Sequence, residues 1–414
     1  MTINAKTLFD PSLEKDNCGF GLIAQRNGKR SRKLVKKSIL GLTSMTHRGA
    51  IGADGKTGDG CGLLFDLNHS FFNFKVGGEL DVELPDFFAV AQLFHKNDLD
   101  FYYSSIRKFL NSQDLDIAVT RSVPVNNEVL GKIARQNLPN ISQVFITSKN
   151  TNLNKERFEA CLLQARKFIE EKFDNDEEFY VCSMSTQTIV YKGLMLPSAI
   201  DEFYLDLKDK KFEAKICLFH QRFSTNTLPR WHLAQPFRLL AHNGEINAIR
   251  GNRNWAKARK SKFSTALIPE ITTFKNLVNE KGSDSSALDN MIEILVKGGI
   301  NTFRALRMVL PPAWQNIHMM DPEIKSFHEY NSMHMEAWDG PAGIVMSDGR
   351  WAICLLDRNG LRPARYQIDN EGYVTIASEI GVFPQDESNF ITKGRIGAGG
   401  IFAIDTETGE FIDQ

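Results

Sequence analysis

The sequence predicts an α+β fold built on antiparallel sheets, and three observations support this prediction. Strand-like apolar segments gather toward both ends of the chain with helical segments between them, an order typical of α+β proteins. Near the C-terminal end, Asp348-Gly349 and Asn359-Gly360 separate such segments as turn dipeptides do in β-hairpins. Paired apolar runs close in sequence, such as 342–347 with 351–357, fit antiparallel neighbours. Separately, the length of 414 residues suffices for one large domain or two medium ones.

The first half of the chain alternates apolar runs with helical periodicity. Leu34, Val35 and Ile39 recur at helical spacing beside a basic run at 30–37, which therefore reads as the solvated face of a helix over 33–45. The other expected elements here are strands at 20–25, 61–65, 87–94 and 116–123, helices at 99–110 and 158–173, a Gly- and Asp-rich loop at 48–62, and polar loop-like stretches at 75–83 and 150–155.

The second half contains two expected helices among many strands. One helix covers 285–297, with Ser283 or Asp284 as its N-cap. The other covers 302–308 and stops before Pro311-Pro312. Expected strands lie at 180–184, 187–191, 215–222, 237–242, 342–347, 351–357, 373–378 and 400–405.

Composition and charge exclude several classes of protein. Lys and Arg total 50, as do Asp and Glu, and this balance argues against a nucleic-acid partner. No apolar run approaches the roughly 18–20 residues of a membrane span. Residues 1–17 carry three acidic side chains and no apolar core, so they do not form a secretory signal. The six cysteines are scattered without a C-x-x-C pair, which indicates a reducing compartment, the cytoplasm, and no zinc site.

Two further motif readings fail. The nine histidines show no H-x-x-x-H spacing, so we expect no metal site. The Gly-rich stretch 49–60 suggests a phosphate loop, but the P-loop pattern requires glycine where Ala50 stands.

Cys18 lies between a short polar leader and an apolar strand-like run. Cleavage of the Asn17–Cys18 bond would put an α-amine on the residue that carries the thiol, which joins a nucleophile and its base in one residue. Such an amine titrates at roughly 7.7–8.0, so a useful fraction accepts a proton near neutral pH. The alternative is a small buried hydrophobic residue, the commoner use of a lone cysteine.

Three other motifs supply what such a nucleophile needs. Arg222 ends an apolar strand and could clamp a carboxylate, although a structural salt bridge is the alternative. Asn243 and the Gly244 N–H could stabilise an oxyanion, although Asn-Gly is also a common hairpin turn. Asp284 could bind a substrate ammonium, cap a helix, or do both.

These motifs, in this order, closely resemble the glutamine amidotransferase domain of the glutamate synthase large subunit, which is of class II, the N-terminal-nucleophile type. The motifs are Cys18-Gly19-Phe20-Gly21, His47-Arg48-Gly49-Ala50, Asp54-Gly55-Lys56-Thr57-Gly58-Asp59-Gly60, Arg222-Phe223-Ser224-Thr225-Asn226-Thr227, His242-Asn243-Gly244-Glu245-Ile246-Asn247 and Ser283-Asp284-Ser285.

The resemblance implies a four-layer αββα sandwich with two antiparallel sheets. It implies that residues 1–17 are a propeptide and that 18–414 form the amidotransferase domain, the N-terminal part of a longer polypeptide. Glutamine would be hydrolysed to glutamate and ammonia through a thioester on Cys18. The implied roles are oxyanion stabilisation for Asn243 and Gly244, substrate binding for Arg222, Asp284 and Thr225, and organisation of the substrate site for Arg48.

The resemblance also implies partners outside this chain. Ammonia would pass to a synthase domain of the same polypeptide, which makes glutamate from 2-oxoglutarate and holds FMN and an iron–sulfur cluster. The complete enzyme would be an NADPH-type oxidoreductase working with a small electron-transfer subunit. We expect this chain itself to bind no cofactor.

Two alternatives remain at this point. A non-catalytic module could bind glutamine or dock a partner with the same pocket, but it would not need Cys18 or an excisable leader. Another N-terminal-nucleophile amidohydrolase could act on a different substrate, but the pair Arg222 and Asp284 favours an α-amino acid.

Overall fold

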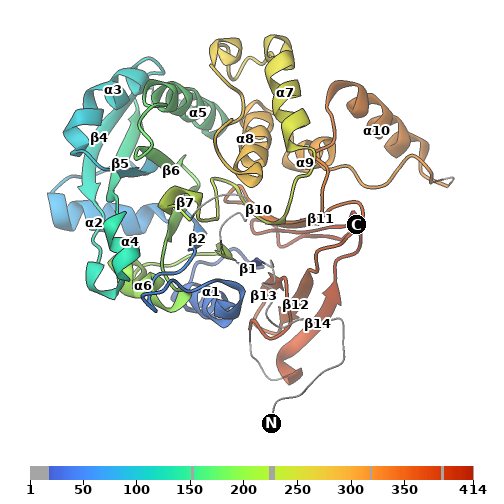
Figure 1. Cartoon of the computed structure of the whole chain (residues 1–414), viewed down its shortest axis with the longest axis horizontal. Coiled ribbons are helices and arrows are strands. Elements are labelled where there is room, and N and C mark those ends of the chain that lie inside the picture. The colour runs from blue at the N-terminus through green and yellow to red at the C-terminus, as the bar shows by residue number, and fades with distance from the viewer. Residues whose placement is uncertain (1–17, 151–152, 223–228, 318, 384–386, 414) are drawn as a thin grey trace.

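A computed structural model describes residues 18–150, 153–222, 229–317, 319–383 and 387–413. Its centre is a sandwich of two antiparallel sheets with helices on both outer faces, as Figure 1 shows. This confirms the predicted αββα arrangement. Within the described residues, none of the helices combines the length and apolar character that a membrane span requires.

The first sheet has seven strands, and β1 lies in its middle between β13 and β8. All seven residues of β1 are buried, so the strand that follows Cys18 is held from both sides. In sheet order the strands are β14 (Phe390–Arg395), β12 (Arg365–Asp369), β13 (Tyr373–Ala377), β1 (Gly19–Gln25), β8 (Ile216–Gln221), β2 (Cys61–Asp66) and β7 (Thr188–Gly193).

The second sheet has five strands, and β9 forms one of its edges. The order is β16 (Phe411–Asp413), β15 (Ile401–Asp405), β11 (Trp351–Leu356), β10 (Ala342–Ser347) and β9 (Leu240–Gly244). Glycines 349 and 360 have positive φ in the turns after β10 and β11, as the Asp-Gly and Asn-Gly dipeptides predict.

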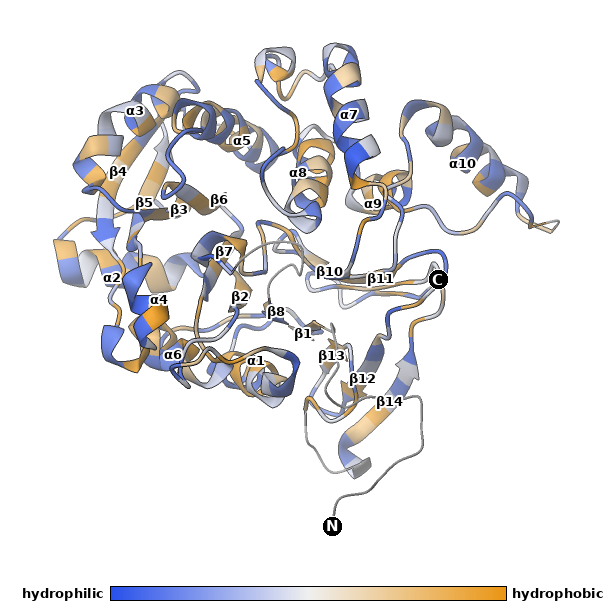
Figure 2. Cartoon of the chain, viewed as in Figure 1, coloured by the Kyte–Doolittle hydropathy of each residue, from blue (hydrophilic) through white to orange (hydrophobic). Residues whose placement is uncertain are grey.

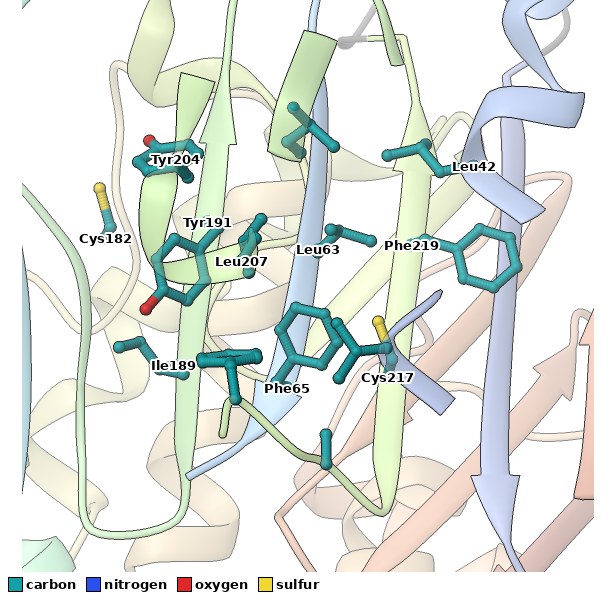
Figure 3. Packing of buried hydrophobic residues seen from close by; sticks show 14 of the residues in the cluster. Leu42, Leu63, Phe65, Cys182, Ile189, Tyr191, Tyr204, Leu207, Cys217 and Phe219 are labelled. Carbon is teal, nitrogen blue, oxygen red and sulfur yellow. The ribbon is translucent and has the colours of Figure 1, made fainter. Parts of the chain in front are cut away.

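Successive side chains of each strand point to opposite faces of its sheet, so the strands contribute to two separate layers of the hydrophobic core. Phe20, Leu22 and Ala24 of β1 point between the two sheets, while Ile23 points to the opposite face. Figure 3 shows this outer face, where alternate residues of β2, β7 and β8 pack beside Leu42 of α1. Figure 2 shows the hydropathy of each residue along these elements, with apolar and polar residues interleaved along the helices.

Helices cover both outer faces of the sandwich. Helix α1 packs on the first sheet, and α8 and α9 pack on the second, where their apolar side chains join those of β10 and β11. The helices are α1 (Arg32–Ser44), α2 (His69–Leu80), α3 (Leu99–Asn111), α4 (Lys132–Gln136), α5 (Lys155–Lys172), α6 (Ile200–Phe203), α7 (Ile249–Arg259), α8 (Asp284–Lys297), α9 (Thr302–Val309) and α10 (Pro322–His334).

A third, four-stranded antiparallel sheet was not predicted. It lies beside the sandwich and packs against α3 and α5 (Figure 1). Its strand β5 pairs with β4 on one side and β3 on the other, and it lies in a stretch where we expected no strand. The order is β4 (Leu115–Ser122), β5 (Asn140–Ser148), β3 (Ala89–His95) and β6 (Tyr180–Ser185).

Two predicted segments are wrong in part. The expected loop at 75–83 is helical up to Leu80, because Asn68 caps α2 and Phe71, Phe72 and Val76 are buried. The expected strand at 237–242 begins only at Leu240, because the Phe237 N–H donates to the Leu240 carbonyl across a turn.

Candidate active site

Cys18 lies at the point where β1 enters the central sheet. The antiparallel register pairs Gly19 with Gln221 of β8, and one residue further along the same register are Cys18 and Arg222. Cys18 is partly buried, whereas the other five cysteines are buried. Two residues far apart in the sequence therefore meet at one edge of the sandwich, as the hypothesis of a nucleophile beside a carboxylate clamp requires.

The Asn243 side chain reaches Cys18 from the second sheet. Its Nδ2 donates to the Cys18 carbonyl oxygen at 2.8 Å. Asn243 and Gly244 are the last residues of β9 and pair with Gly343 and Ala342 of β10, so they do not form the hairpin turn that was the alternative. Gly244 has φ 138°, and a Cβ there would lie 1.7 Å from the Pro341 carbonyl oxygen, so this position requires glycine.

Arg222 is held by the Gly- and Asp-rich loop. Its Nε lies 3.5 Å from Asp59 Oδ2, and its backbone N–H donates to the Gly60 carbonyl at 2.7 Å. Arg222 has φ 90°, a left-handed conformation that is strained for a residue with a side chain and is found most often at functional sites. The salt bridge that was the alternative is therefore present, and it orients the guanidinium at the strand end.

The same loop is anchored at its other end by Asp54. The Asp54 carboxylate accepts from the Thr57 hydroxyl at 2.7 Å and from the Ile133 N–H of α4 at 3.0 Å. These hydrogen bonds, with the Thr57 hydroxyl as the strongest cause, hold the pKa of Asp54 well below its usual range. The loop is thus a brace between α4 and Arg222, and not a phosphate site.

Arg48 lies beside Gly19 and binds an acidic residue beyond β13. Its Nε donates to Glu379 at 3.0 Å, and His47 lies 2.9 Å from the same carboxylate. A Cβ on Gly19 would lie 3.2 Å from Cγ of Arg48. Burial alone would raise the pKa of Glu379, but Arg48 and His47 outweigh it and lower that pKa. Arg48 therefore packs against Gly19 at the start of β1, and its ion pair with Glu379 holds it there.

Asp284 is the first residue of α8 and lies behind the end of β9. Ser283 is the N-cap, since its hydroxyl accepts from the Ser286 N–H at 3.1 Å. Asp284 Oδ2 accepts from the Ile246 N–H at 2.8 Å, which ties the helix start to the residues after Gly244. This arrangement leaves the capping task to Ser283 and places a buried carboxylate near Asn243.

Two buried histidines, to which the sequence motifs assign no role, lie beneath these residues. His242 Nδ1 lies 2.8 Å from Ser285 Oγ, and His220 Nε2 lies 3.1 Å from the His242 carbonyl oxygen. Burial lowers the pKa of His220 to about 3 and also lowers that of His242, so both rings are neutral near pH 7. His242 directly precedes Asn243 and His220 lies two residues before Arg222, so their place beside these two motif residues was the available signal.

Most predicted site residues are thus brought together. Cys18, Arg222, Asn243, Gly244 and Asp284 converge where β1, β8, β9 and α8 begin or end, and Arg48 lies beside Gly19. Thr225 lies outside the described residues.

The donor side chains in the described part of the chain do not fit an iron–sulfur cluster. Within the residues that the structure describes, His, Cys, Asp and Glu do not gather in groups of three or more that could hold a metal ion. Burial raises the pKa of the Cys182 thiol to about 12 and raises those of Cys61, Cys217 and Cys354 as well, which opposes the thiolate that such a cluster needs.

Sequence comparisons agree with this geometry. The family model of class-II glutamine amidotransferases matches residues 18–414. Glutamate synthase [NADH] of Saccharomyces cerevisiae is 38% identical over 98% of this chain, and the match covers 20% of that protein. The large chain of glutamate synthase [NADPH] of Bacillus subtilis is also 38% identical, over 99% of this chain and 27% of that protein.

A solved structure gives a weaker comparison. Glutamine phosphoribosylpyrophosphate amidotransferase from B. subtilis covers 96% of this chain with 12% identity and a TM-score of 0.40, and 48% of that chain is matched. The fold assignment therefore stands on the strand pairing described above. The chain spans between 20% and 27% of the length of the two curated relatives named. With the family model matched from Cys18 to Gln414, the chain belongs to the class-II glutamine amidotransferases.

Proposed function

We propose that this chain hydrolyses the side-chain amide of L-glutamine, with Cys18 as the nucleophile. The observation that carries the proposal is the hydrogen bond from Asn243 Nδ2 to the Cys18 carbonyl oxygen at 2.8 Å. It sets an amide donor of the second sheet beside the residue that would attack, as stabilisation of an oxyanion requires. The family match supports the same reaction.

In the proposed reaction, the Cys18 thiol gives its proton to the α-amine of the same residue and attacks the amide carbon. The developing oxyanion accepts hydrogen bonds from Asn243 Nδ2 and the Gly244 N–H. Collapse of the intermediate breaks the C–N bond, and ammonia leaves with the proton that the amine held. Water then attacks the thioester, which gives glutamate and restores the thiol.

The two charged ends of glutamine would bind on either side of Cys18. Arg222, oriented by Asp59, would bind the α-carboxylate through its forked guanidinium. Asp284 would bind the α-ammonium. Arg48 would hold the strand start in place through Glu379, and Thr225 of the Arg-Phe-Ser-Thr motif would complete the substrate site.

The α-amine of Cys18 exists only if Asn17 is removed. We therefore propose that residues 1–17 are a propeptide and that the mature domain is 18–414. The family match, which begins at residue 18, supports this boundary. With the leader attached, the nitrogen of Cys18 is an amide and cannot act as a base, so the uncut chain would be an inactive precursor.

The relatives suggest a wider activity. We propose that this chain is the glutaminase part of a glutamate synthase, in which the ammonia passes to a synthase domain of the same polypeptide and reacts with 2-oxoglutarate. FMN, the iron–sulfur cluster and contact with an electron-transfer subunit would belong to the rest of that polypeptide. The scattered thiols support a reducing compartment, the cytoplasm, as the place of action.

Two measurements test the proposal. Cys18→Ala should abolish glutamine hydrolysis, whereas Cys161→Ala, which removes a buried thiol of α5, should not. The intact mass of the active protein should correspond to a chain that starts at Cys18. Retained hydrolysis in Cys18→Ala would refute the nucleophile assignment. A retained leader in a protein that binds glutamine without hydrolysing it would favour a non-catalytic binding module.

A further inference from the structure

The Asp284 carboxylate is held by a short chain of buried polar groups. Its Oδ1 lies 3.3 Å from Ser285 Oγ, and Ser285 Oγ lies 2.8 Å from His242 Nδ1. Asp284 is 7% exposed, Ser285 2% and His242 1%, so these contacts are largely shielded from bulk water. This series of polar contacts connects the start of α8 to β9, next to Asn243.

The direction of each hydrogen bond follows from the chemistry of the groups. An ionised carboxylate only accepts, so the Ser285 hydroxyl donates its proton to Asp284. The Ser285 oxygen then accepts from His242, which requires the single proton of the neutral ring to be on Nδ1. His242 Nε2 is left as a buried acceptor with no hydrogen-bond partner among the described residues. The tautomer of His242 therefore fixes where the Ser285 proton points.

We propose that Ser285, aimed by His242, is a positioning residue that orients the Asp284 carboxylate toward the α-ammonium group of the substrate. This inference rests on the proposed function, in which Asp284 binds that group. The Ile246 N–H fixes Oδ2 and Ser285 fixes Oδ1, so the carboxylate plane is set from two sides. Ser285 thus contributes to the selection of amino acids over acids that lack the amine.

The neighbouring serines provide a matched control. Ser286 Oγ donates to the Ser283 carbonyl at 2.9 Å and accepts from Asn279 Nδ2 at 2.7 Å. It is 5% exposed and lies in the same first turn of α8, but its hydrogen bonds run to Ser283 and Asn279. Ser286→Ala therefore removes the same atoms as Ser285→Ala without touching the proposed chain of contacts.

Steady-state kinetics of the whole polypeptide that carries this chain test the inference. The substrates are L-glutamine and 5-amino-5-oxopentanoate, the same amide without the α-amine. Ser285→Ala should raise KM for glutamine about tenfold, as expected for loss of a hydrogen bond to a charged group, and leave kcat within about twofold. It should leave kcat/KM for the desamino substrate unchanged. Ser285→Thr, which keeps the hydroxyl, should restore KM, and Ser286→Ala should leave both substrates unaffected.

The outcomes separate this inference from the function on which it rests. Asp284→Asn is measured in parallel, and if it leaves KM for glutamine unchanged, the role of Asp284 itself is wrong. If Asp284→Asn raises KM and Ser285→Ala does not, only the positioning role is wrong. An equal loss for both substrates in Ser285→Ala would show a merely structural effect and would also overturn the inference.

Discussion

At the scale of single residues, Arg222 combines a structural and a proposed binding role. Asp59 holds its Nε and the Gly60 carbonyl holds its backbone, so the guanidinium is fixed before any ligand arrives. A side chain that is already ordered loses less entropy on binding than a mobile one. The ion pair and the carboxylate clamp, which the sequence presented as alternatives, are therefore compatible.

Arg222→Lys should chiefly weaken glutamine binding. Lysine keeps the positive charge but lacks the fork that matches two carboxylate oxygens, so KM for glutamine should rise by roughly 10–100-fold with a smaller change in kcat. Asp59→Asn should raise KM in the same direction by less, because the guanidinium remains but loses its orienting charge. Steady-state hydrolysis assays measure both, and an unchanged KM in Arg222→Lys would exclude the clamp.

At the scale of elements, the start of α8 supports the site through its cap. Ser283 accepts the Ser286 N–H, and the next two residues are Asp284 and Ser285. A frayed first turn would move both side chains. The stability of one helix end and the affinity for an amino acid are thus expected to change together.

Ser283→Ala should destabilise the fold by about 1 kcal/mol, the usual value of an N-cap, and should also raise KM for glutamine. The Asn154 side chain caps α5 by accepting from the Arg157 N–H at 2.9 Å. Asn154→Ala should therefore lower the free energy of unfolding by a similar amount without changing KM. Chemical denaturation measures the free energy of unfolding for both variants. If Ser283→Ala and Asn154→Ala had the same KM for glutamine, the N-cap of α8 would have no role in glutamine binding.

Sequence patterns predicted the elements whose burial is regular and missed those that depend on distant partners. The helix α1 and the strands β1, β2 and β8 follow clear apolar periods and lie within one or two residues of the predictions. Strand β14 is mostly exposed, so no alternation marks it. The Gly77-Gly78 pair obscures α2, which tertiary burial nevertheless makes helical.

The residues of the candidate site also fall into those that local motifs predicted and those that depend on distant partners. Cys18, Asn243 and Asp284 belong to local motifs and could be named from the sequence. Their supports, such as Asp59 for Arg222 and Glu379 for Arg48, lie more than one hundred residues away along the chain. Only the sheet register brings these partners together, and no local pattern encodes that register for residues in loops.

At the scale of the whole molecule, two histidines are buried in an uncharged form inside the sandwich. His220 is 0% exposed and His242 is 1% exposed, and burial lowers both pKa values, that of His220 to about 3. In the unfolded chain each would titrate near 6.5. As pH falls below that value the unfolded state binds protons that the folded state does not, so stability is progressively lost.

The free energy of unfolding should therefore fall as the pH drops from 7 to 5, and below pH 6.5 the contribution of His220 approaches about 1.4 kcal/mol per pH unit. Asp289 acts in the opposite direction below pH 6, because burial raises its pKa to about 6 and the folded state then binds a proton first. His220→Gln keeps a donor but does not titrate, so it should flatten the slope relative to the unaltered chain. Denaturant titrations across this pH range measure the difference, and an unchanged slope in His220→Gln would contradict it.

The burial of five of the six cysteines has a chemical consequence for work with this protein. Burial raises the pKa of these five thiols, so they hold their protons, whereas Cys18 at the rim of the sheet is only partly buried. Among the cysteines, a thiol-directed electrophile added to the folded chain therefore meets one that is not buried. Cys18 is thus the cysteine that a covalent label is expected to modify first.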